Sequence, residues 1–416
     1  MGSKTLLVLS QVYVPDPTSV GQHMADASVE MVKRGWRVVV FTSDRGYENP
    51  SDKYTRYETI DGVEVRRLPL TSFGKHSMAL RLLAACSFVL QCIFLGLFVR
   101  RVAAVFATTS PPFSSFGALV ISLLRRVPIK FWVMDLNPDQ LIAMEKISSS
   151  SVPARLFNGL NRLILHRADD IVALDRFMAD RLNRKVNVSS KMHVMPPWPH
   201  QDHRDVVARA NNPFRKNHGL EEKFVFMYSG NHGFTTPVTT ILQAALRLQK
   251  EKELVFMFIG GGHGKKEVEQ VIAEHHPPNI ISLPYQPLSQ TKYSLSAADV
   301  HLVTMWDQVV GIIHPCKIYG AMSVQRPILM VGPEPSHVTD ILDEYRIGWR
   351  VPRGDTEAAA AMIRKIMATD KRELVEMGHR AAKAVAAHYT KQHLCGRFCD
   401  VLESGLCGPL ATEASQ

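Results

Sequence analysis

The feature that most constrains the fold is an alternation of short apolar runs with helical stretches. It begins with the apolar run 4–10, a helical stretch 21–35 that ends at a glycine, and a second apolar run 37–43. This order is typical of a parallel sheet covered by helices. Similar apolar runs follow at "VEVRRLP", "AAVFATT", "IKFWVMD", "DDIVAL" and "MHVMPP". The N-terminal half is therefore predicted to be a doubly wound α/β domain.

Residues 196–222 interrupt this alternation, since they are rich in Pro, Asn and charge. It then starts again, with strands expected at "KFVFMYSG", "ELVFMFIGGG", "NIISLPY", "DVHLVTM" and "PILMVG", and helices at 237–250, 265–274, 289–297 and 315–323. We predict two doubly wound Rossmann-like domains, 1–200 and 201–390, that face each other across a cleft. Residues 391–416 are expected to form a helix that packs back towards the N-terminal domain, followed by a tail.

The composition narrows the classes of partner. The formal charge of +10, from 49 Lys and Arg against 39 Asp and Glu, favours an anionic partner. Nucleic acid is not expected, because the basic residues are scattered without an aromatic-rich basic strand or a recognition-helix pattern. The six cysteines show neither CxxC nor zinc spacing, which predicts reduced thiols in a cytosolic compartment. No signal peptide is recognised at the N-terminus.

The segment 82–99 is apolar except for Ser87 and Gln91, and Arg100 and Arg101 follow it. It is about long enough to span a bilayer. A span would separate strands expected in one sheet, so we favour a helix inserted in one leaflet, with a buried or partner-covered helix and a true span as alternatives. The apolar residues expected to enter the membrane are Leu82, Leu83, Phe88, Leu90, Ile93, Phe94 and Phe98.

Four loops that follow predicted strands of the second domain are candidate ligand loops: "SGNHG" (229–233), "GGGHGKK" (260–266), "LPYQP" (283–287) and "GIIHPCK" (311–317). Glycines after a strand let backbone amides approach a phosphate closely, and the N-terminus of a following helix attracts negative charge. The GxGxxG pattern is absent from the first strand turn of both halves, which disfavours a dinucleotide.

Lys317 stands out among these loop residues. Pro315 is suited to the first turn of a helix, which places Lys317 in that turn. A lysine there is unfavourable against the helix dipole unless an anion lies beside it. We therefore predict that Lys317 binds a pyrophosphate, the alternative being a solvated surface lysine.

At these residues the chain resembles the family 4 glycosyltransferases of the GT-B fold, which are retaining enzymes with nucleotide-sugar donors. The resemblance is carried by "QVYVPDPTSVGQHMADASVEMVKRGWRVVVFTS", "FWVMDLNPD", "DDIVALDRFMADRL", "YSGNHG", "FIGGG", "LPYQP", "SAADVHLV" and "HPCKIYGAMSVQRPIL" in this order. It covers nearly the whole chain. The subgroup most similar acts on polyisoprenyl-linked sugars in bacterial surface polysaccharide assembly.

The resemblance implies a role for particular residues. Residues 201–390 would bind the nucleotide sugar through Gly230, His232, Gly233, Gly261, Lys317 and Glu334. Gly21 of the first domain would lie against the donor phosphates. His232 would take part of the role of a basic residue that the family carries after this loop. Glu334 would replace a ribose-binding glutamate, since Gly320 stands at its usual place. Residues 1–200 would be the acceptor side, with Asp135 and Asp139 near the sugar and the acceptor hydroxyl. For Asp135 a helix N-cap or a loop hydrogen bond is the alternative.

The expected activity is that of a retaining hexosyltransferase that moves a sugar from a nucleotide donor, expected to be UDP-linked, to an undecaprenyl-diphosphate-linked acceptor. The protein is expected to work at the cytoplasmic face of the cell membrane, as a peripheral or monotopic protein. No Asp-x-Asp occurs in the chain, so neither a metal nor another cofactor is expected, and Lys317 with helix N-termini would stabilise the leaving group. The alternatives are a nucleotide-sugar epimerase of similar shape and a non-catalytic, membrane-docked scaffold.

Overall fold

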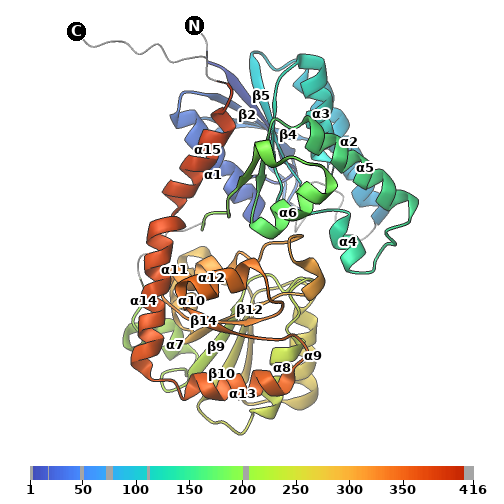
Figure 1. Cartoon of the computed structure of the whole chain (residues 1–416). Helices are drawn as coiled ribbons and strands as arrows, with labels where there is room; N and C mark the ends of the chain where they lie inside the picture. The colour runs from blue at the N-terminus through green and yellow to red at the C-terminus, as the bar shows by residue number, and fades with distance from the viewer. Residues whose placement is uncertain are drawn as a thin grey trace, which may run out of the picture. The chain divides into compact units, whose positions relative to one another are not determined.

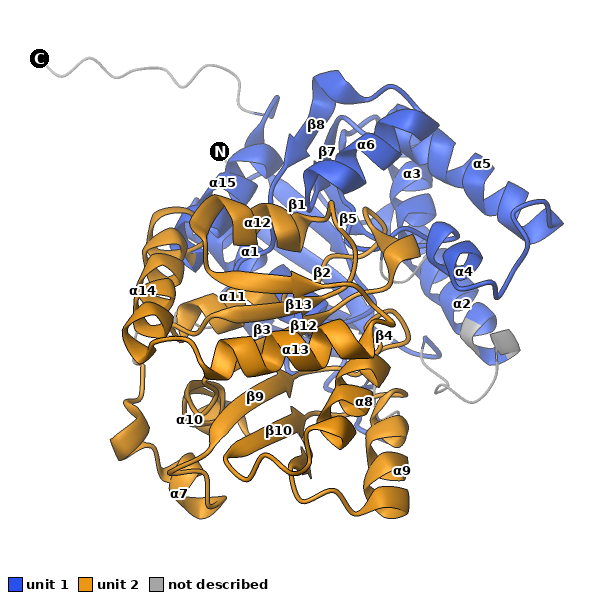
Figure 2. Ribbon diagram, turned by 60° about the horizontal axis from the view of Figure 1, so that its bottom comes forward, with its two compact units in different colours: residues 1–200, 391–416 blue, residues 201–390 orange. Residues whose placement is uncertain are grey.

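The structure is a computed structural model that describes residues 3–16, 18–46, 51–71, 78–109, 113–199 and 206–406. The chain divides into two compact units, of which unit 1 is formed by residues 1–200 with 391–416 and unit 2 by residues 201–390 (Figure 2). The division falls within the Pro- and Asn-rich stretch that we predicted as the boundary. Cys407 and the predicted tail lie outside the described residues.

Unit 1 is built on an eight-stranded sheet of order β3-β4-β2-β1-β5-β6-β7-β8 (Figure 1). All neighbouring strands are parallel except β3 and β4, which pair antiparallel. The strands are β1 Thr5–Leu9, β2 Arg37–Ser43, β3 Tyr57–Ile60, β4 Val63–Leu68, β5 Val102–Thr108, β6 Ile129–Trp132, β7 Asp170–Ala173 and β8 Met192–Val194. β1 is buried along its whole length, as expected of a central strand with helices on both faces.

The helices of unit 1 are α1 Ser19–Lys33, α2 Met78–Gly96, α3 Ser114–Arg125, α4 Asp139–Ala143, α5 Val152–Arg167, α6 Arg176–Lys185 and α15 Lys391–Glu403. The connections β1 to β2 and β5 to β6 cross the sheet in opposite directions. Because such crossovers are right-handed, α1 and α3 cover opposite faces. α15 contacts α1, whereas α2, α3 and α5 lie side by side on the other face (Figure 1).

α15 is anchored to unit 1 by an aromatic cluster and by a shared carboxylate. The Phe398 ring lies 4.5 Å from that of Trp132 and 5.6 Å from that of Trp198, measured between centroids. Asp26 of α1 accepts one hydrogen bond from Trp198 Nε1 at 3.0 Å and one from Lys391 Nζ at 2.7 Å. The Asp26 carboxylate thus binds both Trp198, near the end of the first segment of unit 1, and Lys391, at the start of the second.

Unit 2 is a six-stranded parallel sheet of order β11-β10-β9-β12-β13-β14 (Figure 2). Its strands are β9 Phe224–Ser229, β10 Leu254–Ile259, β11 Ile280–Leu283, β12 Val300–Thr304, β13 Ile328–Val331 and β14 Gly348–Val351. Its helices are α7 Pro213–Asn217, α8 Thr239–Arg247, α9 Lys265–His275, α10 Thr291–Ser296, α11 Lys317–Ser323, α12 His337–Tyr345, α13 Thr356–Met367 and α14 Lys371–His388. Each unit is therefore a doubly wound, Rossmann-like domain.

Candidate functional site

Two glycine-rich loops at the carboxyl ends of β9 and β10 are joined by backbone hydrogen bonds. The N–H of Gly230 donates to the Ile259 carbonyl at 2.9 Å, and the N–H of His232 donates to the Gly261 carbonyl at 2.8 Å. The N–H of Gly264 returns a bond to the His232 carbonyl, also at 2.8 Å. The predicted loops 229–233 and 260–266 therefore form one rigid edge of unit 2.

Three glycines of this edge, Gly230, Gly260 and Gly262, have a positive φ, and the first and last of them also adjoin side chains. Gly230 has a φ of +123°, and a Cβ atom built on it would lie 3.1 Å from Cε and 3.3 Å from Nζ of Lys317. Gly262 has a φ of +115°, and its Cβ would lie 2.2 Å from Oδ1 of Asn231. Both backbone conformations are open to glycine and strained for other residues. The glycines let the two loops and Lys317 approach one another.

Lys317 is the first residue of α11, and its partly exposed side chain reaches the first of these loops. Its Nζ donates to the Asn231 carbonyl at 3.0 Å and lies 4.8 Å from the ring centroid of Tyr228. Within the described part of the chain, no carboxylate forms a salt bridge with Lys317. Its positive charge is therefore held beside the glycine loops without a counter-ion, as an anion-binding role requires.

Lys265 is a second lysine of this edge, for which we predicted no role from the sequence. It is buried at the start of α9, and its Nζ donates to the carbonyls of Phe258 at 2.6 Å and of Leu283 at 2.8 Å. Burial lowers the pKa of Lys265 to about 8. The ammonium group thus joins the ends of β10 and β11. The position of a lysine just after a glycine loop is the sequence signal that could have identified it.

The structure corrects the predicted role of His232. Its side chain is fully buried, with the rings of Tyr228 and Phe258 beside it. Burial and the nearby charges of Lys265 and Lys317 lower the pKa of His232 to about 4, so the ring is neutral at pH 7. A neutral, enclosed imidazole cannot replace the family's basic residue at a diphosphate. The sequence could not reveal this, because the burial depends on β10 and α9.

The other residues predicted to bind the donor have different surroundings. A Cβ on Gly261 would lie 3.0 Å from the ring of Tyr285, which places the loops 260–266 and 283–287 together. The N–H of Gly233 is used by Thr236 Oγ1 at 3.1 Å. Glu334 follows β13, is exposed, and pairs with Arg350 at 3.5 Å. β13 lies beside β12, and the segment after β12 leads to Lys317 at the start of α11.

Gly21 belongs to unit 1, where it lies in the first turn of α1. Its N–H donates to Oγ1 of the N-cap residue Thr18 at 3.2 Å. A Cβ on Gly21 would lie 2.8 Å from that oxygen and 3.2 Å from the backbone N of Tyr13. The close approach of helix and loop is therefore sufficient to explain this glycine.

Asp135 lies between β6 and α4, beside a small hollow of about 20 Å³ lined by residues of unit 1, among them Thr109, Asn137 and Lys185. Its backbone N–H donates to Thr109 Oγ1 at 3.1 Å. The side chain reaches solvent, yet the protein crowded around the carboxyl group raises the pKa of Asp135 to about 6. The N-cap position of α4 is occupied by Pro138, so the N-cap alternative for Asp135 is wrong.

Asp139, which we predicted near the sugar and the acceptor hydroxyl, has a carboxylate that two cations already hold. Its Oδ2 accepts a hydrogen bond from Lys185, and its Oδ1 lies 3.7 Å from Arg181. The side chain is 13% exposed. Both cations come from α6, which follows in the chain only after α5 and β7. Asp139 therefore joins α4 to α6.

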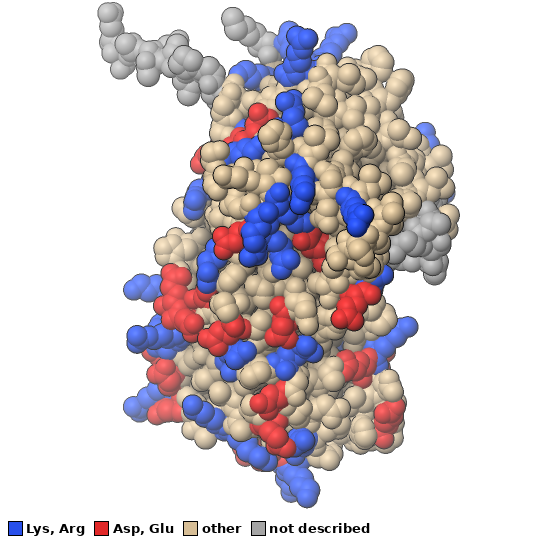
Figure 3. Space-filling model, turned by 45° about the vertical axis from the view of Figure 1, so that its right-hand side comes forward, with Lys and Arg blue, Asp and Glu red and all other residues tan. Residues whose placement is uncertain are grey.

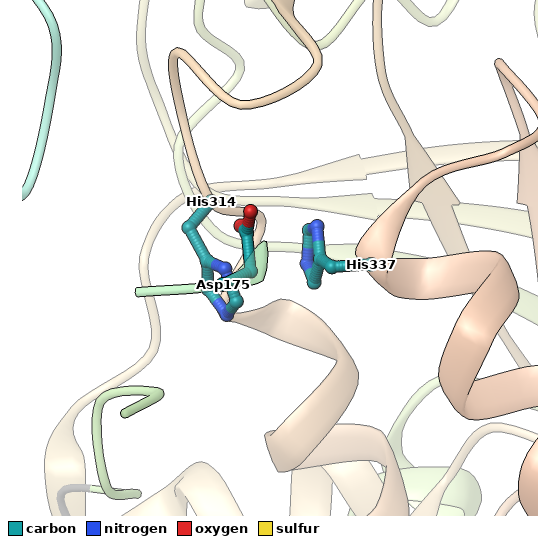
Figure 4. A group of neighbouring side chains, drawn as sticks. All are labelled: Asp175, His314 and His337. Atoms are coloured by element: carbon teal, nitrogen blue, oxygen red, sulfur yellow. The ribbon is translucent and has the colours of Figure 1, made fainter. Parts of the chain in front are cut away.

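A pair of histidines lies near the start of α11 (Figure 4). The rings of His314 and His337 stack with their centroids 3.8 Å apart, and His314 Nε2 lies 2.8 Å from the hydroxyl oxygen of Tyr319. Both histidines belong to unit 2. Asp175, which Figure 4 also labels, belongs to unit 1, where its Oδ1 caps α6 by accepting from the Met178 N–H at 2.8 Å.

α2 has a buried and an exposed apolar face. Phe88 is fully buried, which corrects its assignment to the membrane, and Ile93 is half-buried. The exposed members of the predicted set are Leu82, Leu83, Leu90, Phe94 and Phe98. Along the described residues, no helix is both long and apolar enough to cross a bilayer.

Comparison with known proteins gives matches in both units. The model of the glycosyl transferase 4-like domain matches residues 18–198, and that of the glycosyl transferases group 1 matches residues 211–384. The chain is 29% identical over 274 residues to the probable glycosyltransferase WbjE of Pseudomonas aeruginosa, covering 65% of this chain and 68% of that protein. It is 24% identical over 330 residues to the putative colanic acid biosynthesis glycosyl transferase WcaI of Escherichia coli K12, covering 77% and 81%.

Solved structures share the fold. The Anabaena protein HepE, crystallised in complex with UDP and glucose, superposes with a TM-score of 0.72 at 12% identity, covering 96% of this chain and 99% of that one. WaaG, a glycosyltransferase involved in lipopolysaccharide biosynthesis, gives a TM-score of 0.71 at 13% identity, covering 96% and 100%. The architecture is thus the two-domain GT-B fold that we predicted from the sequence.

Proposed function

Because the chain belongs to the glycosyltransferases, with a glycosyl transferase 4-like domain followed by a group 1 domain, we propose that it moves a sugar from a UDP-linked donor to a lipid-linked acceptor with retention of configuration. The observation that carries the donor part is the ammonium group of Lys317, which is held beside two joined glycine loops with no counter-ion among the described residues. The Anabaena protein of the same fold binds UDP and glucose, which supports a uridine nucleotide.

Catalysis would rest on charge placed in advance. In the reaction the bond between the sugar C1 and the diphosphate oxygen breaks, a bond forms from C1 to the acceptor oxygen, and the acceptor proton passes to the departing phosphate. Negative charge grows on the diphosphate as this bond breaks, so the positive charge of Lys317 stabilises the transition state more than the ground state. Such a same-face reaction needs no covalent nucleophile and no metal.

Asp135 is the group that we assign to the acceptor side. A carboxylate that reaches solvent can accept a hydrogen bond from the incoming hydroxyl and orient it. Because its pKa is raised to about 6, the carboxyl group is ionised mainly above about pH 6. Asp139 is not given this role, because Lys185 and Arg181 already hold its carboxylate.

A lipid-linked acceptor agrees with the relatives and with the surface of unit 1. WcaI is named for colanic acid biosynthesis and WaaG for lipopolysaccharide biosynthesis. The exposed apolar residues of α2 offer contact with a membrane, where such an acceptor resides. We propose that the protein works at the cytoplasmic face of the cell membrane, on an undecaprenyl-diphosphate-linked sugar.

The test is a transfer assay on the purified protein, with vesicles that carry the polyprenyl-diphosphate-linked sugar and a panel of UDP-sugars and GDP-sugars. Mass spectrometry would detect the extended lipid, and NMR would assign the configuration at the new linkage. We expect an extended lipid only with a UDP-sugar, and the new linkage should retain the configuration of the donor. Conversion of the donor without an acceptor would point to an epimerase, and an inverted linkage would exclude the retaining mechanism.

A further inference from the structure

The surface of unit 1 points to a membrane contact broader than α2 alone. We propose that the outward faces of α2, α3 and α5 form one docking platform for a bilayer rich in anionic lipid. This inference rests on the proposed function in that a lipid-linked acceptor must be reached at a membrane. We call these three faces the platform.

The three helices form a continuous layer. α2 contacts α3, and α3 contacts α5, on the face of the sheet opposite α1 and α15. Arg125 at the end of α3 donates to the carbonyls of Gly96 at 3.0 Å, Leu97 at 2.8 Å and Val99 at 2.6 Å. These bonds satisfy the free carbonyls at the end of α2 and hold the ends of both helices side by side. The layer is therefore a fixed surface.

The outer side of this layer is apolar on all three helices. Its exposed large apolar residues are Leu80, Leu82, Leu83, Leu90 and Phe94 on α2, with Leu97 and Phe98 just after it, Phe116, Leu123 and Leu124 on α3, and Val152, Leu156 and Leu163 on α5. Single exposed apolar side chains are normal on a soluble protein, whereas a contiguous set marks an interaction site. Figure 3 brings this side forward and shows the upper right of the view mainly tan.

The charge of the platform indicates which partner it binds. None of the three helices contains an Asp or a Glu, and no acidic residue occurs between Glu64 and Asp135. Asp169, an exposed acid, follows α5 by two residues, and the other exposed charged residues within or just after the helices are cations: Arg100, Arg101, Arg126, Arg155, Arg162 and Arg167. None of them makes a salt bridge to a described residue. Apolar side chains with unpaired arginines around them match an anionic lipid surface, where the side chains enter the acyl boundary and the guanidinium groups reach the headgroups.

The packing of α2 limits how deeply this surface can enter. Phe88, Val89 and Cys92 are buried, and a Cβ on Gly117 of α3 would lie 3.7 Å from Val89 Cγ1. Pulling α2 out to insert alone would expose this core. Only the outward side chains can dip into the membrane, so α3 and α5 share the contact with α2.

The experiment is flotation with vesicles of phosphatidylcholine, either pure or with about 30 mol % phosphatidylglycerol. The double variant Leu124→Ser with Leu156→Ser changes α3 and α5 but leaves α2 intact. It should bind the anionic vesicles at least about ten-fold more weakly, as should Leu90→Ser with Phe94→Ser on α2. The matched control is Val375→Ser, an exposed apolar position in unit 2, which should float like the wild type.

The arginines are tested separately. Arg126→Gln with Arg162→Gln should weaken binding to the anionic vesicles, whereas binding to pure phosphatidylcholine should change little. Wild-type flotation of the α3 and α5 variant would overturn the platform in favour of α2 alone. Equal wild-type binding to both kinds of vesicle would overturn the role of anionic lipid. A lipid-free dimer that this variant dissociates would show that a second copy covers the face.

The outcome can be separated from the failure of the proposed function. UDP titration and thermal unfolding of the same variants in solution show whether the fold and unit 2 are intact. If the variants lose flotation but bind UDP as the wild type does, the platform stands whether or not transfer is observed. If the wild type binds vesicles yet shows no transfer, the proposed function fails while the platform stands.

Discussion

The ammonium group of Lys317 lies 4.8 Å from the ring centroid of Tyr228, the penultimate residue of β9. The same group donates to the Asn231 carbonyl, so one contact involves the strand and the other the loop that follows it. The lysine is thus held in place before any ligand arrives. A charged side chain that is already ordered loses less conformational entropy on binding a ligand than one that must first be ordered.

Lys317→Ala should weaken UDP binding by about ten- to hundred-fold, because a hydrogen bond to a charged group contributes about 1.5–3 kcal/mol. Calorimetric titration measures this. Lys292→Ala is the matched control, since Lys292 of unit 2 lies 5.2 Å from the ring centroid of Tyr293 but outside the glycine loops. Equal UDP affinity in wild type and Lys317→Ala would remove the assignment.

Gly230→Ala should both destabilise the fold and weaken UDP binding. A non-glycine residue at a φ of +123° costs about 1–3 kcal/mol, and the added methyl group meets the side chain of Lys317. Denaturant unfolding and UDP titration test the two effects. Gly159 lies in the middle of α5, and a Cβ built on it would have no atom within 4 Å. Gly159→Ala should therefore raise the stability by about 0.5–1 kcal/mol.

Asp135 should give a pH dependence opposite to that of a salt-bridged acid. Its pKa is raised from 3.8 to about 6, so between these values the folded state binds more protons than the unfolded state. This contribution to stability therefore falls as the pH rises through the window. Asp135→Asn should be more stable than wild type at pH 7, and the gain should shrink towards pH 4.

The same variant tests the acceptor role. Asp135→Asn should slow transfer more than it weakens UDP binding, and wild-type transfer should decline below about pH 6. Equal loss of both would mean a structural role. Asp139→Asn serves as the contrast, because it breaks the pairs with Lys185 and Arg181 and leaves their donors unsatisfied, which should lower stability at pH 7 by about 1–3 kcal/mol.

The stability of the wild type should rise with pH in the alkaline range because of Lys265, and Lys265→Met should lack this rise. The lowered pKa of Lys265, about 8, means that the folded state binds fewer protons than the unfolded state between there and 10.5. The wild type is therefore stabilised by this group as the pH rises through that window, and Lys265→Met should lack the effect. Urea unfolding at pH 7.5 and near pH 10 would measure it, with the exposed neighbour in Lys266→Met as control.

Lys265→Met should also weaken UDP binding, because the carbonyls of Phe258 and Leu283 lose the ammonium group that joins the two strand ends. The loops that follow these strands would then be less ordered. Wild-type UDP affinity in this variant would restrict Lys265 to a structural role.

Phe398→Ala should lower the free energy of unfolding by about 3–5 kcal/mol, as expected for a fully buried aromatic side chain. The lost contacts are those with Trp132 and Trp198, so tryptophan fluorescence reports on the same place. Val375→Ala, at an exposed position of α14, should change stability by less than about 0.5 kcal/mol. A small loss in Phe398→Ala would mean that α15 does not anchor unit 1.

Most strands could be predicted because they are local patterns of sequence. Buried parallel strands appear as unbroken apolar runs, as in β1 and β10. β3 and β14 were not predicted. β3 is an exposed edge strand with polar residues, and β14 is only four residues long. Neither has the apolar run that identifies a buried strand.

The sequence by itself determined the two doubly wound domains, the boundary between them and a lysine placed between a strand and a helix, because these depend on the order of residues near one another. Only the tertiary structure decided which side chains remain available. It buried His232 and Phe88, paired Asp139 with Lys185, which is 46 residues away, and placed Lys265 across two strand ends. Burial and pairing arise between distant segments, and no local pattern encodes which segments will meet.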